Sequence, residues 1–345
     1  MRNGRAVSMA QVAQRAGVSH QTVSRVLNAP ELVREPTRLR VQEAIRELGF
    51  RPNLAARALV RGTTTSLIGA VSPGNALFGP NHLLAAIDRA AHAHSFATVI
   101  GTLPEADLEA AHATSERFRV MGVQGVVFIA VGPPTAALAS TLADDLPVCV
   151  IAPHFDDPRV SVIGVDHAAG ARMAVEELVA EGRRRVTHVA GPQGWFDADV
   201  RAAAWQEETA RLGVRGDLLP GGWSAGDGYA AAAAVLAAHP RPDAVFCAND
   251  QVALGLMRGL AHAGVSVPDD IAVVGFDDVD GADHFSPSLT TIRQPFAEVG
   301  ERSIEVLWAM IGGAPPVREL LAPTLVVRSS SRARQAALSG PRLQP

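Results

Sequence analysis

The sequence predicts a small all-α head followed by a large α/β region of two doubly wound parallel-sheet lobes. Residues 8–50 form helix-length segments separated by helix breakers such as Gly17. From Thr63 onward, short apolar runs alternate with alanine-rich segments of helical length, which is typical of parallel sheets covered by helices. Roughly 270 residues exceed what one such sheet usually holds, so we expect two lobes with a cleft between them.

The composition is that of a soluble globular protein, since 48% of the 345 residues are hydrophobic and 19% are charged. No apolar run approaches the roughly 20 residues of a membrane span, and no apolar segment follows Arg2 and Arg5, so we expect no signal peptide. Cys149 and Cys247 both lie in apolar runs. They are interpreted as buried core thiols rather than a disulfide, which suits a reducing cytoplasm.

The charge is unevenly distributed along the chain. The first 62 residues hold eleven arginines and four glutamates, a net charge of +7, whereas the whole chain has a net charge of −4. The remainder therefore carries −11. A basic head on an acidic body is typical of a module that neutralises nucleic-acid phosphates, joined to a body that does not.

The head begins with two predicted helices. Ser8 is the expected N-cap of a helix over Met9–Ala16, and Gln11 stands at the capping-box spacing. Gly17 breaks the chain, and Ser19 can cap the helix that follows. The stretch therefore reads as helix, tight turn, helix.

The second of these helices carries two kinds of side chain. Val23, Val26 and Leu27 form one apolar stripe for packing. The side chains that point elsewhere are of types that bind base edges in the major groove, arginine to guanine and glutamine to adenine: His20, Gln21, Ser24 and Arg25. The alternative is a small helical hairpin with a solvated polar face.

Residues 31–50 predict a third helix whose apolar pattern comes from Leu39, Ile45 and Leu48. Arg34 stands where a cap is expected and Pro36 lies in the first turn, so we expect a poorly capped helix entrance. Residues 51–62 follow, RPNLAARALVRG. An isolated helix of about eight residues frays in water, which favours an element that folds only when a partner holds it. A plain interdomain linker is the alternative.

The larger region predicts strands at SLIGAVS, FATVIG, GVVFIA, PVCVIA, VSVIGV, RRVTHVAG, DAVFCAN, IAVVGFD and PTLVV, and helices at His82–His94, Ala169–Glu181 and Gln251–Gly264. We assign the first lobe to 63–165 and 296–328 and the second lobe to 166–295, with PTLVV returning to the first lobe. A polar tail over 329–345 lacks apolar heptads, so a dimer is favoured over a tetramer held by a C-terminal coiled coil.

Polar side chains follow several of the second-lobe strands. Ligands bind at the carboxyl ends of strands in open α/β sheets, and Asp197, Arg201, Asn249 and Asp277 supply groups that hold hydroxyls in fixed geometry. Trp223 offers a flat apolar face for a sugar ring, although a core position is the alternative. Asp278 can equally be a helix cap.

The segment VAQRAGVSHQTVSRVLN resembles the recognition unit of the lac repressor family of bacterial transcription factors, and the similarity extends through RPNLAARAL over nearly the whole chain. The resemblance implies a helix-turn-helix DNA-binding domain over 1–50, a hinge helix over 51–62 and a periplasmic-binding-protein-like effector domain. It also implies a homodimer that binds palindromic double-stranded operator DNA.

The resemblance assigns DNA contacts to ten residues. Bases are read by Arg25, Gln21 and His20, phosphates are available to Ser19, Thr22 and Asn28, and the central minor groove is engaged by Asn53, Ala56, Arg57 and Leu59. Leu59 matches the leucine that the family inserts into the minor groove. Wedging an apolar side chain between base steps kinks the duplex at a cost of a few kcal/mol, which extra contacts offset.

The resemblance also implies an effector-binding set: Leu77, Asn81, Asp197, Arg201, Trp223, Asn249, Asp277 and Gln294. Two positions depart from the family pattern. Asp197 replaces a smaller hydroxyl residue, and Pro153 or its neighbour stands where the pattern has an aspartate. Both departures bear on which ligand is bound.

These observations predict a dimeric repressor in the cytoplasm, controlled by a mono- or disaccharide and needing no cofactor or metal. A purine co-repressor or a phosphorylated metabolite is the alternative effector, and a solute-binding protein is a more distant possibility. An enzyme is disfavoured because no G-x-S-x-G, Walker A, G-x-G-x-x-G or H-E-x-x-H motif occurs. His92 and His94 are two residues apart, so they face different directions on a helix and cannot bind one metal ion together. Arg183–Arg185 is interpreted as a solvated turn.

Overall fold

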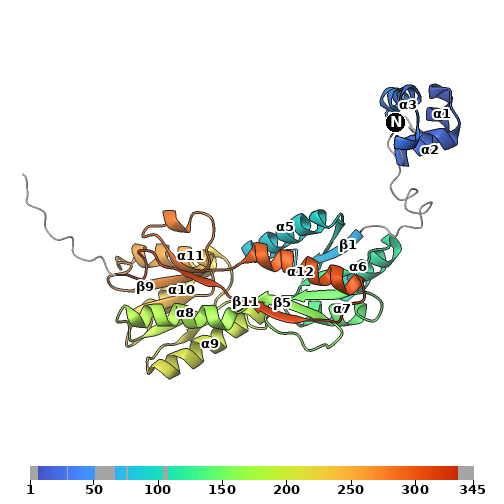
Figure 1. Cartoon of the computed structure of the whole chain (residues 1–345). Helices are drawn as coiled ribbons and strands as arrows, with labels where there is room; N and C mark the ends of the chain where they lie inside the picture. The colour runs from blue at the N-terminus through green and yellow to red at the C-terminus, as the bar shows by residue number, and fades with distance from the viewer. Residues whose placement is uncertain (1–6, 29, 51–66, 75–76, 104–107, 333–345) are drawn as a thin grey trace, which may run out of the picture. The chain divides into compact units, whose positions relative to one another are not determined.

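The computed structural model describes residues 7–28, 30–50, 67–74, 77–103 and 108–332 (Figure 1). The chain divides into two compact units, Met1–Thr65 and Ser66–Pro345, which are described separately. Within the described ranges, no helix has the length and apolar character needed to cross a membrane.

The first unit is a three-helix head, with α1 over Met9–Ala16, α2 over His20–Asn28 and α3 over Glu35–Leu48. The predicted capping box at α1 is confirmed, since Ser8 and Gln11 bond each other's backbone N–H groups. Gly17 ends α1 in the left-handed conformation at φ 64°, which glycine adopts without steric cost.

One small core holds the three head helices together. Val12 of α1, Val23 of α2 and Val41 of α3 are fully buried in it. The expected packing stripe of the second helix is therefore confirmed. The third helix is shorter than expected, because a 3₁₀ turn at Pro30–Leu32 precedes it.

The entrance of α3 has no side-chain cap at Arg34, as predicted. The prediction that Leu39 packs in the core was wrong, because 54% of Leu39 is exposed. Val41 and Ala44 are buried instead, and Ile45 and Leu48 pack beside them. The buried face thus follows the helical repeat from Val41 and leaves Leu39 on the other side.

The second unit contains two six-stranded sheets, each with helices on both faces (Figure 1). The first sheet has the order β11-β5-β4-β3-β1-β2, with strands Arg318–Leu321, Ser161–Val165, Val148–Ile151, Val126–Ile129, Leu67–Ser72 and Ala97–Thr102. The second has the order β12-β10-β9-β8-β6-β7, with strands Thr324–Val326, Thr290–Arg293, Ala272–Asp277, Ala244–Cys247, Val186–Val189 and Leu218–Leu219. All strand pairs are parallel except β10 with β12.

Apolar cores form between each sheet and its helices. In the first lobe, α5 (Phe78–Ala93) and α12 (Phe296–Ile311) cover one face, and α6 (Leu108–Met121) and α7 (Pro133–Leu142) cover the other. In the second lobe, α10 (Ala225–Ala237) and α11 (Asp250–His262) lie opposite α8 (His167–Ala180) and α9 (Phe196–Leu212). Cys149 and Cys247 are buried in these cores with free thiols, as expected.

The placement of the last apolar run in the first lobe was wrong. Its strand β12 pairs antiparallel with β10 in the second sheet, with Ile292 opposite Leu325. The strand that returns to the first sheet is β11, which pairs with β5. Residues 318–320 of β11 are exposed at the sheet edge, so it lacks the apolar signature that marks a buried strand.

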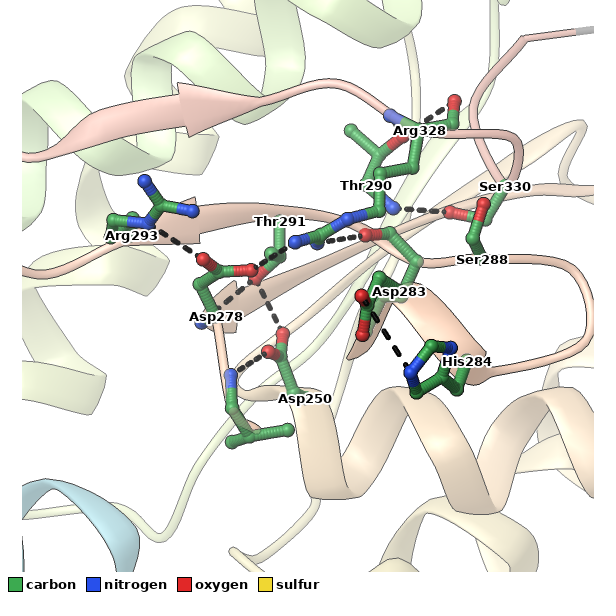
Figure 2. A network of polar contacts seen from close by, with 12 residues as sticks. Asp250, Asp278, Asp283, His284, Ser288, Thr290, Thr291, Arg293, Arg328 and Ser330 are labelled. Atoms are coloured by element: carbon green, nitrogen blue, oxygen red, sulfur yellow. Dashed lines mark hydrogen bonds and ion pairs between the residues drawn. The ribbon is translucent and has the colours of Figure 1, made fainter. Parts of the chain in front are cut away.

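The polar tail also begins later than expected. Ser330 and Ser331 are fully buried, and Ser330 Oγ accepts a hydrogen bond from the Thr290 N–H at 2.8 Å (Figure 2). The Ser330 N–H donates to the Ser288 carbonyl. Hydrogen bonding to the loop before β10 therefore makes these serines part of the second lobe, and residues 333–345 lie outside the described chain.

Two phenylalanines interlock the lobes. Phe196, the first residue of α9, packs against the first-lobe core, and its N–H donates to the Val131 carbonyl at 2.9 Å. In return, Phe78 at the start of α5 packs against the second-lobe core. Phe78 also lies edge-on to Phe296 of α12, with ring centroids 5.9 Å apart. Each lobe thus places one aromatic ring on the core of the other.

Candidate functional site

A cavity lies between the two lobes, at the carboxyl ends of both sheets, and encloses about 660 Å³ of space that is partly open to solvent. The lining residues are Leu77, Phe78, Gly79, Pro80, Leu83, Ile129, Ala130, Val131, Ile151, Ala152, Gly164, Val165, His167, Trp195, Asp197, Arg201, Trp223, Asn249, Asp277, Gln294 and Phe296.

The structure brings most of the predicted effector residues together. The cavity is lined by Leu77, Asp197, Arg201, Trp223, Asn249, Asp277 and Gln294, whose binding roles remain predictions. Asn81 does not line it; its side chain is exposed on α5, so the expectation of a pocket position there is not met. Pro153 is likewise outside the lining set.

The second-lobe strands position the polar groups. Asp277 is the last residue of β9, Gln294 directly follows β10, and Asn249 follows β8 as the N-cap of α11. Because parallel strands end at one edge of the sheet, residues far apart in sequence meet there. Arg201 reaches the same edge from the second turn of α9.

Arg201 is the central cation of the site and is only 3% exposed. Its Nε and Nη2 donate to His167 Nδ1 at 3.2 and 3.1 Å, and its Nη1 donates to the Ala248 carbonyl. The guanidinium stacks 3.8 Å from the centre of the Phe276 ring, a cation–π contact that also fixes its plane. Arg201 is therefore held rigidly before any ligand arrives.

His167 was missed by the sequence reasoning, although it follows the N-cap Asp166 directly after β5. Its Nδ1 accepts from Arg201, so its Nε2 carries the proton and donates to Asp197 Oδ1 at 3.3 Å. Burial and the Arg201 charge lower the pKa of His167 despite Asp197. The imidazole is thus neutral and links a cation to a carboxylate. The feature of the sequence that could have identified His167 is its position as a polar residue just after the end of a strand.

Asp277 is buried, and Gln294 Nε2 donates to its Oδ1 at 2.6 Å. Burial raises the pKa of Asp277 to about 6, against the attraction of Arg201. Asp278 caps no helix; it pairs with the guanidinium groups of Arg293 and Arg328 at 2.6 Å each (Figure 2). Of these two carboxylates, Asp277 therefore lines the cavity, whereas Asp278 connects β10 with the segment that follows β12.

Trp223 lines the cavity and is not a core residue. Asn249 Nδ2 donates to the Trp223 carbonyl at 3.1 Å, while Asn249 Oδ1 caps α11 by accepting from the Val252 N–H. Trp195 lies edge-on to Trp223, with ring centroids 5.6 Å apart and planes at 63°. The indole thus lines the cavity beside an amide held in place by the backbone, with the Arg201 guanidinium 5.7 Å from the centre of its ring.

The described part of the head presents the expected recognition side chains. His20, Gln21 and Arg25 are exposed on α2. Ser19 Oγ accepts from the Thr22 N–H at 3.1 Å and lies 2.9 Å from Thr22 Oγ1, so it caps the helix. Asn28 is the last residue of α2. The four remaining predicted DNA contacts, Asn53, Ala56, Arg57 and Leu59, lie outside the described residues.

The arginine run before β6 is not a solvated turn as expected. Arg183 donates to the carbonyls of Asp243 and Pro268, and the N–H groups of Arg184 and Arg185 donate to the Asp243 carboxylate. These hydrogen bonds thus connect the run to the loops that precede β8 and β9. The described residues contain no group of His, Cys, Asp or Glu suited to hold a metal ion.

Comparison with known proteins assigns both units. Residues 8–53 match the family described as bacterial regulatory proteins, lacI family, and residues 175–331 match the periplasmic binding protein-like domain. The lactose operon repressor of Klebsiella pneumoniae is 33% identical over 332 residues, which cover 95% of this chain and 93% of that protein. This chain belongs to the lacI family.

Solved structures of lacI-family proteins have the same fold. A lac repressor dimer bound to operator and the anti-inducer ONPF superposes with a TM-score of 0.85 at 31% identity, covering 95% of this chain and all of that one. A complex of the transcriptional regulator CelR with cellobiose gives 0.71 at 28% identity, covering 94% and 99%. As a member of the lacI family, this chain is a DNA-binding repressor of transcription controlled by a small-molecule effector.

Proposed function

We propose that the chain is a homodimeric repressor in the cytoplasm that binds a palindromic operator and responds to a carbohydrate effector bound between its lobes. The observation that carries the effector proposal is the convergence of Asp197, Arg201, Asn249 and Asp277 on one cavity that Trp223 also lines. Fixed donors and acceptors around a flat apolar surface match a sugar ring, which has hydroxyls at its rim and an apolar face. The relatives named for lactose and bound to cellobiose support the same class of ligand.

A phosphorylated effector fits the cavity poorly. A phosphate needs cations that are free to pair with it, and the Arg201 guanidinium is already bonded to His167 and the Ala248 carbonyl. Asp197 and Asp277 line the same cavity and repel an anion. A neutral polyhydroxylated ligand meets no such repulsion.

A purine co-repressor is also disfavoured. A nucleobase binds best between two parallel aromatic faces, whereas the ring planes of Trp195 and Trp223 meet at 63°. We further propose that the chain catalyses no reaction, because the polar groups of the cavity are engaged in holding one another rather than arranged as a nucleophile and its base.

Effector binding is expected to act on DNA through the arrangement of the lobes. A ligand shifts an equilibrium only by binding one state more tightly than the other, and this cavity is built from both lobes. A different arrangement of the lobes would alter contacts between them, such as the hydrogen bond from the Phe196 N–H to the Val131 carbonyl. We propose that residues 51–62, with Leu59, pass this difference to the head.

The effector proposal is tested by a thermal-shift screen of the full chain. Mono- and disaccharides are compared with hypoxanthine, guanine and sugar phosphates, since a ligand selective for the folded state raises Tm. We expect the shifts to come from neutral sugars, and the same sugars to release the operator in a binding assay. If only purines or only sugar phosphates raise Tm, the effector belongs to that class and not to the carbohydrates.

The DNA-binding proposal is tested with Arg25→Ala. Loss of a bidentate contact with guanine should cost about 1–3 kcal/mol at one operator position and relax the base preference there. The matched control is Arg46→Ala on α3, whose side chain pairs with Glu43 on the helix surface. Unchanged preference at every position in titrations of single-base operator variants would remove Arg25 from base recognition.

A further inference from the structure

His167, at the start of α8, lies between two of the polar side chains that line the cavity, Asp197 and Arg201 of α9. We infer, on the basis of the proposed carbohydrate function, that His167 is a positioning residue of the effector site: its neutral imidazole holds the Arg201 guanidinium and the Asp197 carboxylate where hydroxyls of the sugar meet them. Only 4% of His167 is exposed, so it has little surface of its own to offer a ligand. It acts through the two side chains that it contacts.

The Arg201 side chain is oriented by the single acceptor of the His167 ring. Arg201 Nε and Nη2 both donate to His167 Nδ1, at 3.2 and 3.1 Å, and Nη1 donates to the Ala248 carbonyl. Phe276 supports both groups, since its ring centre lies 3.8 Å from the guanidinium and 5.7 Å from the centre of the imidazole. Within the described residues, these bonds use three of the five N–H donors of Arg201 and leave two that a ligand hydroxyl can meet.

The Asp197 carboxylate is held by the other nitrogen of the ring. His167 Nε2 lies 3.3 Å from Asp197 Oδ1. Because Nδ1 accepts from Arg201, the proton of the neutral ring is on Nε2, the nitrogen that faces this oxygen. Asp197 lines the cavity with 38% of its side chain exposed, which leaves its second oxygen to accept from a ligand hydroxyl. The ring thus fixes a donor and an acceptor of the site relative to each other.

This arrangement requires an uncharged ring. Burial lowers the pKa of His167 and the Arg201 charge adds to this, against the attraction of the neighbouring carboxylates. The groups that face the ring come from α9, from its own helix and from β9: Asp197, Arg201, Asp166 and the uncharged Phe276. A proton on Nδ1 would remove the acceptor of both Arg201 donors and put a second cation beside the guanidinium. Effector affinity should therefore fall in acid.

A second buried histidine in the same lobe separates positioning from packing. His188 of β6 is fully buried, its Nδ1 lies 2.9 Å from the Phe246 carbonyl, and its ring stacks on that of Phe246. His188 does not line the cavity. Replacing either histidine removes a buried imidazole, but of the two only His167 contacts Asp197 and Arg201. His188→Asn is therefore the matched control.

Two variants of His167 each keep one of its contacts. In His167→Asn the amide oxygen stands near the place of Nδ1 and can accept from Arg201, whereas in His167→Gln the amide nitrogen stands near that of Nε2 and can donate to Asp197. Isothermal titration calorimetry of the full chain at pH 8 uses lactose, cellobiose, galactose, glucose and ribose as probes. For a sugar that binds the wild type, each variant should lower affinity roughly five- to a hundredfold, because one polar group of the site loses its partner. His188→Asn should leave affinity nearly unchanged.

Asp197→Asn tests whether His167 acts through its neighbours. His167→Asn gives up the contact with Asp197, so in the Asp197→Asn background it should cost little further affinity. His167→Gln gives up the acceptor for Arg201, so its loss should persist in that background. A residue that only fills space would give the same loss in both backgrounds with both variants.

The pH dependence supplies a readout that packing does not change. The pKa of His167 lies below its ordinary value of 6.5, so the folded state binds this proton less tightly than the unfolded state, and the stability contributed by the neutral ring is lost as pH falls below 6.5. Asp277, with a pKa of about 6, titrates in wild type and variant alike. The ratio of wild-type to His167→Asn affinity should therefore shrink from pH 8 to 5. Without ligand, the gap in unfolding free energy between the two proteins in urea should narrow likewise, and His167→Gln replaces His167→Asn if the latter does not fold.

Three results overturn the inference while the carbohydrate proposal stands: both variants bind the sugar as the wild type does, both lose the same affinity in each Asp197 background, or the affinity ratio stays constant with pH. If hypoxanthine, guanine or glucose 6-phosphate binds and no sugar does, the carbohydrate proposal fails, and the same variants titrated with that ligand decide the role of His167. If no probe binds, a gap in unfolding free energy that narrows in acid supports a ring held neutral, and a constant gap overturns the inference.

Discussion

The two lobes share one architecture but present different chemistry to the cavity between them. Each is a six-stranded sheet between two layers of helices. In the first lobe, β3 and β4 end on Ile129 and Ile151, whereas in the second lobe β9 ends on Asp277, and Asn249 and Gln294 follow β8 and β10. The topology therefore determines where a ligand lies, and a few strand-end residues determine which ligand it is.

Individual carboxylates in the two lobes have pKa values shifted in opposite directions. In the first lobe, the hydrogen bond from Arg159 holds the pKa of Asp157 well below its usual range, although burial opposes it. In the second lobe, burial raises the pKa of Asp250 to about 8 and that of Asp277 to about 6. The first lobe thus uses a carboxylate for stability, and the second tolerates the cost of burying two near the cavity.

The largest expected effect comes from removing the cation of the second lobe. Arg201→Ala should lower effector affinity at least a hundredfold, because Asp277 and Asp197 then line the cavity without their shared cation. Operator affinity without effector should stay nearly unchanged. Calorimetry with the effector and a salt-controlled operator titration measure the two quantities.

The control for Arg201 is Arg119→Ala in the first lobe, a surface arginine that pairs with Asp145. It should change neither effector nor operator affinity. Equal losses of both affinities in Arg201→Ala would mean that the residue supports the fold rather than the site.

The reciprocal phenylalanines provide the next test. Phe196→Ala and Phe78→Ala should each lower the free energy of unfolding by about 1–2 kcal/mol, since both rings are only half-buried and lose cross-lobe packing. Trp308→Ala, at a 55% exposed aromatic, should cost about 0.5 kcal/mol or less. Urea unfolding measures all three, and a loss at Trp308 as large as at Phe196 would contradict the interlock.

The contrast in carboxylates predicts opposite pH dependences. Asp250 has a folded pKa of about 8 against an ordinary value of 3.8, so the folded state binds its proton more tightly and stability falls as pH rises from about 4 to 8. Asp250→Asn should flatten this fall by up to about 1.4 kcal/mol per pH unit. Its amide can accept from the Val279 N–H and donate to Thr291 Oγ1.

Asp157→Asn is the matching change in the first lobe. The lowered pKa of Asp157 contributes stability above its unfolded value that is lost as pH falls, so this variant should be less stable at pH 7 and converge with the wild type in acid. Urea unfolding from pH 2 to 9 covers both pH windows and separates the two signs. Parallel stability curves for Asp250→Asn and the wild type would place the proton on another group.

The smallest effect on the free energy of unfolding is expected from the ion pairs that Asp278 makes with Arg293 and Arg328 (Figure 2). Arg293 is 57% exposed, so Arg293→Ala should cost about 0–1 kcal/mol while Asp278 keeps its pair with Arg328. Arg328→Ala should cost more, because Arg328 also donates to the Leu289 carbonyl. If Arg293→Ala instead lowered the free energy of unfolding more than Arg328→Ala in urea, Arg293 would be the more important partner of Asp278.

Much of this organisation was predictable, because its causes are local. Buried parallel strands are continuously apolar, and helix caps have short-range signatures, as at Ser8 and Ser19. The second-lobe site was predictable for the same reason, since its polar residues interrupt apolar runs. The signals failed for β11, whose edge position gives no apolar run, and for His167, which precedes no recognised motif.

By itself, the sequence determined most of the order of helices and strands, the basic head and most of the polar residues at strand ends. Only the tertiary structure decided which lobe receives β12, that Asn81 faces away, that Asp278 pairs with arginines, and that one cavity wall is wholly apolar. The physical reason is the separation along the chain over which each kind of interaction acts. Capping and periodicity act over a few residues, whereas strand pairing and cavity walls join residues more than a hundred positions apart, such as Ile151 and Phe296.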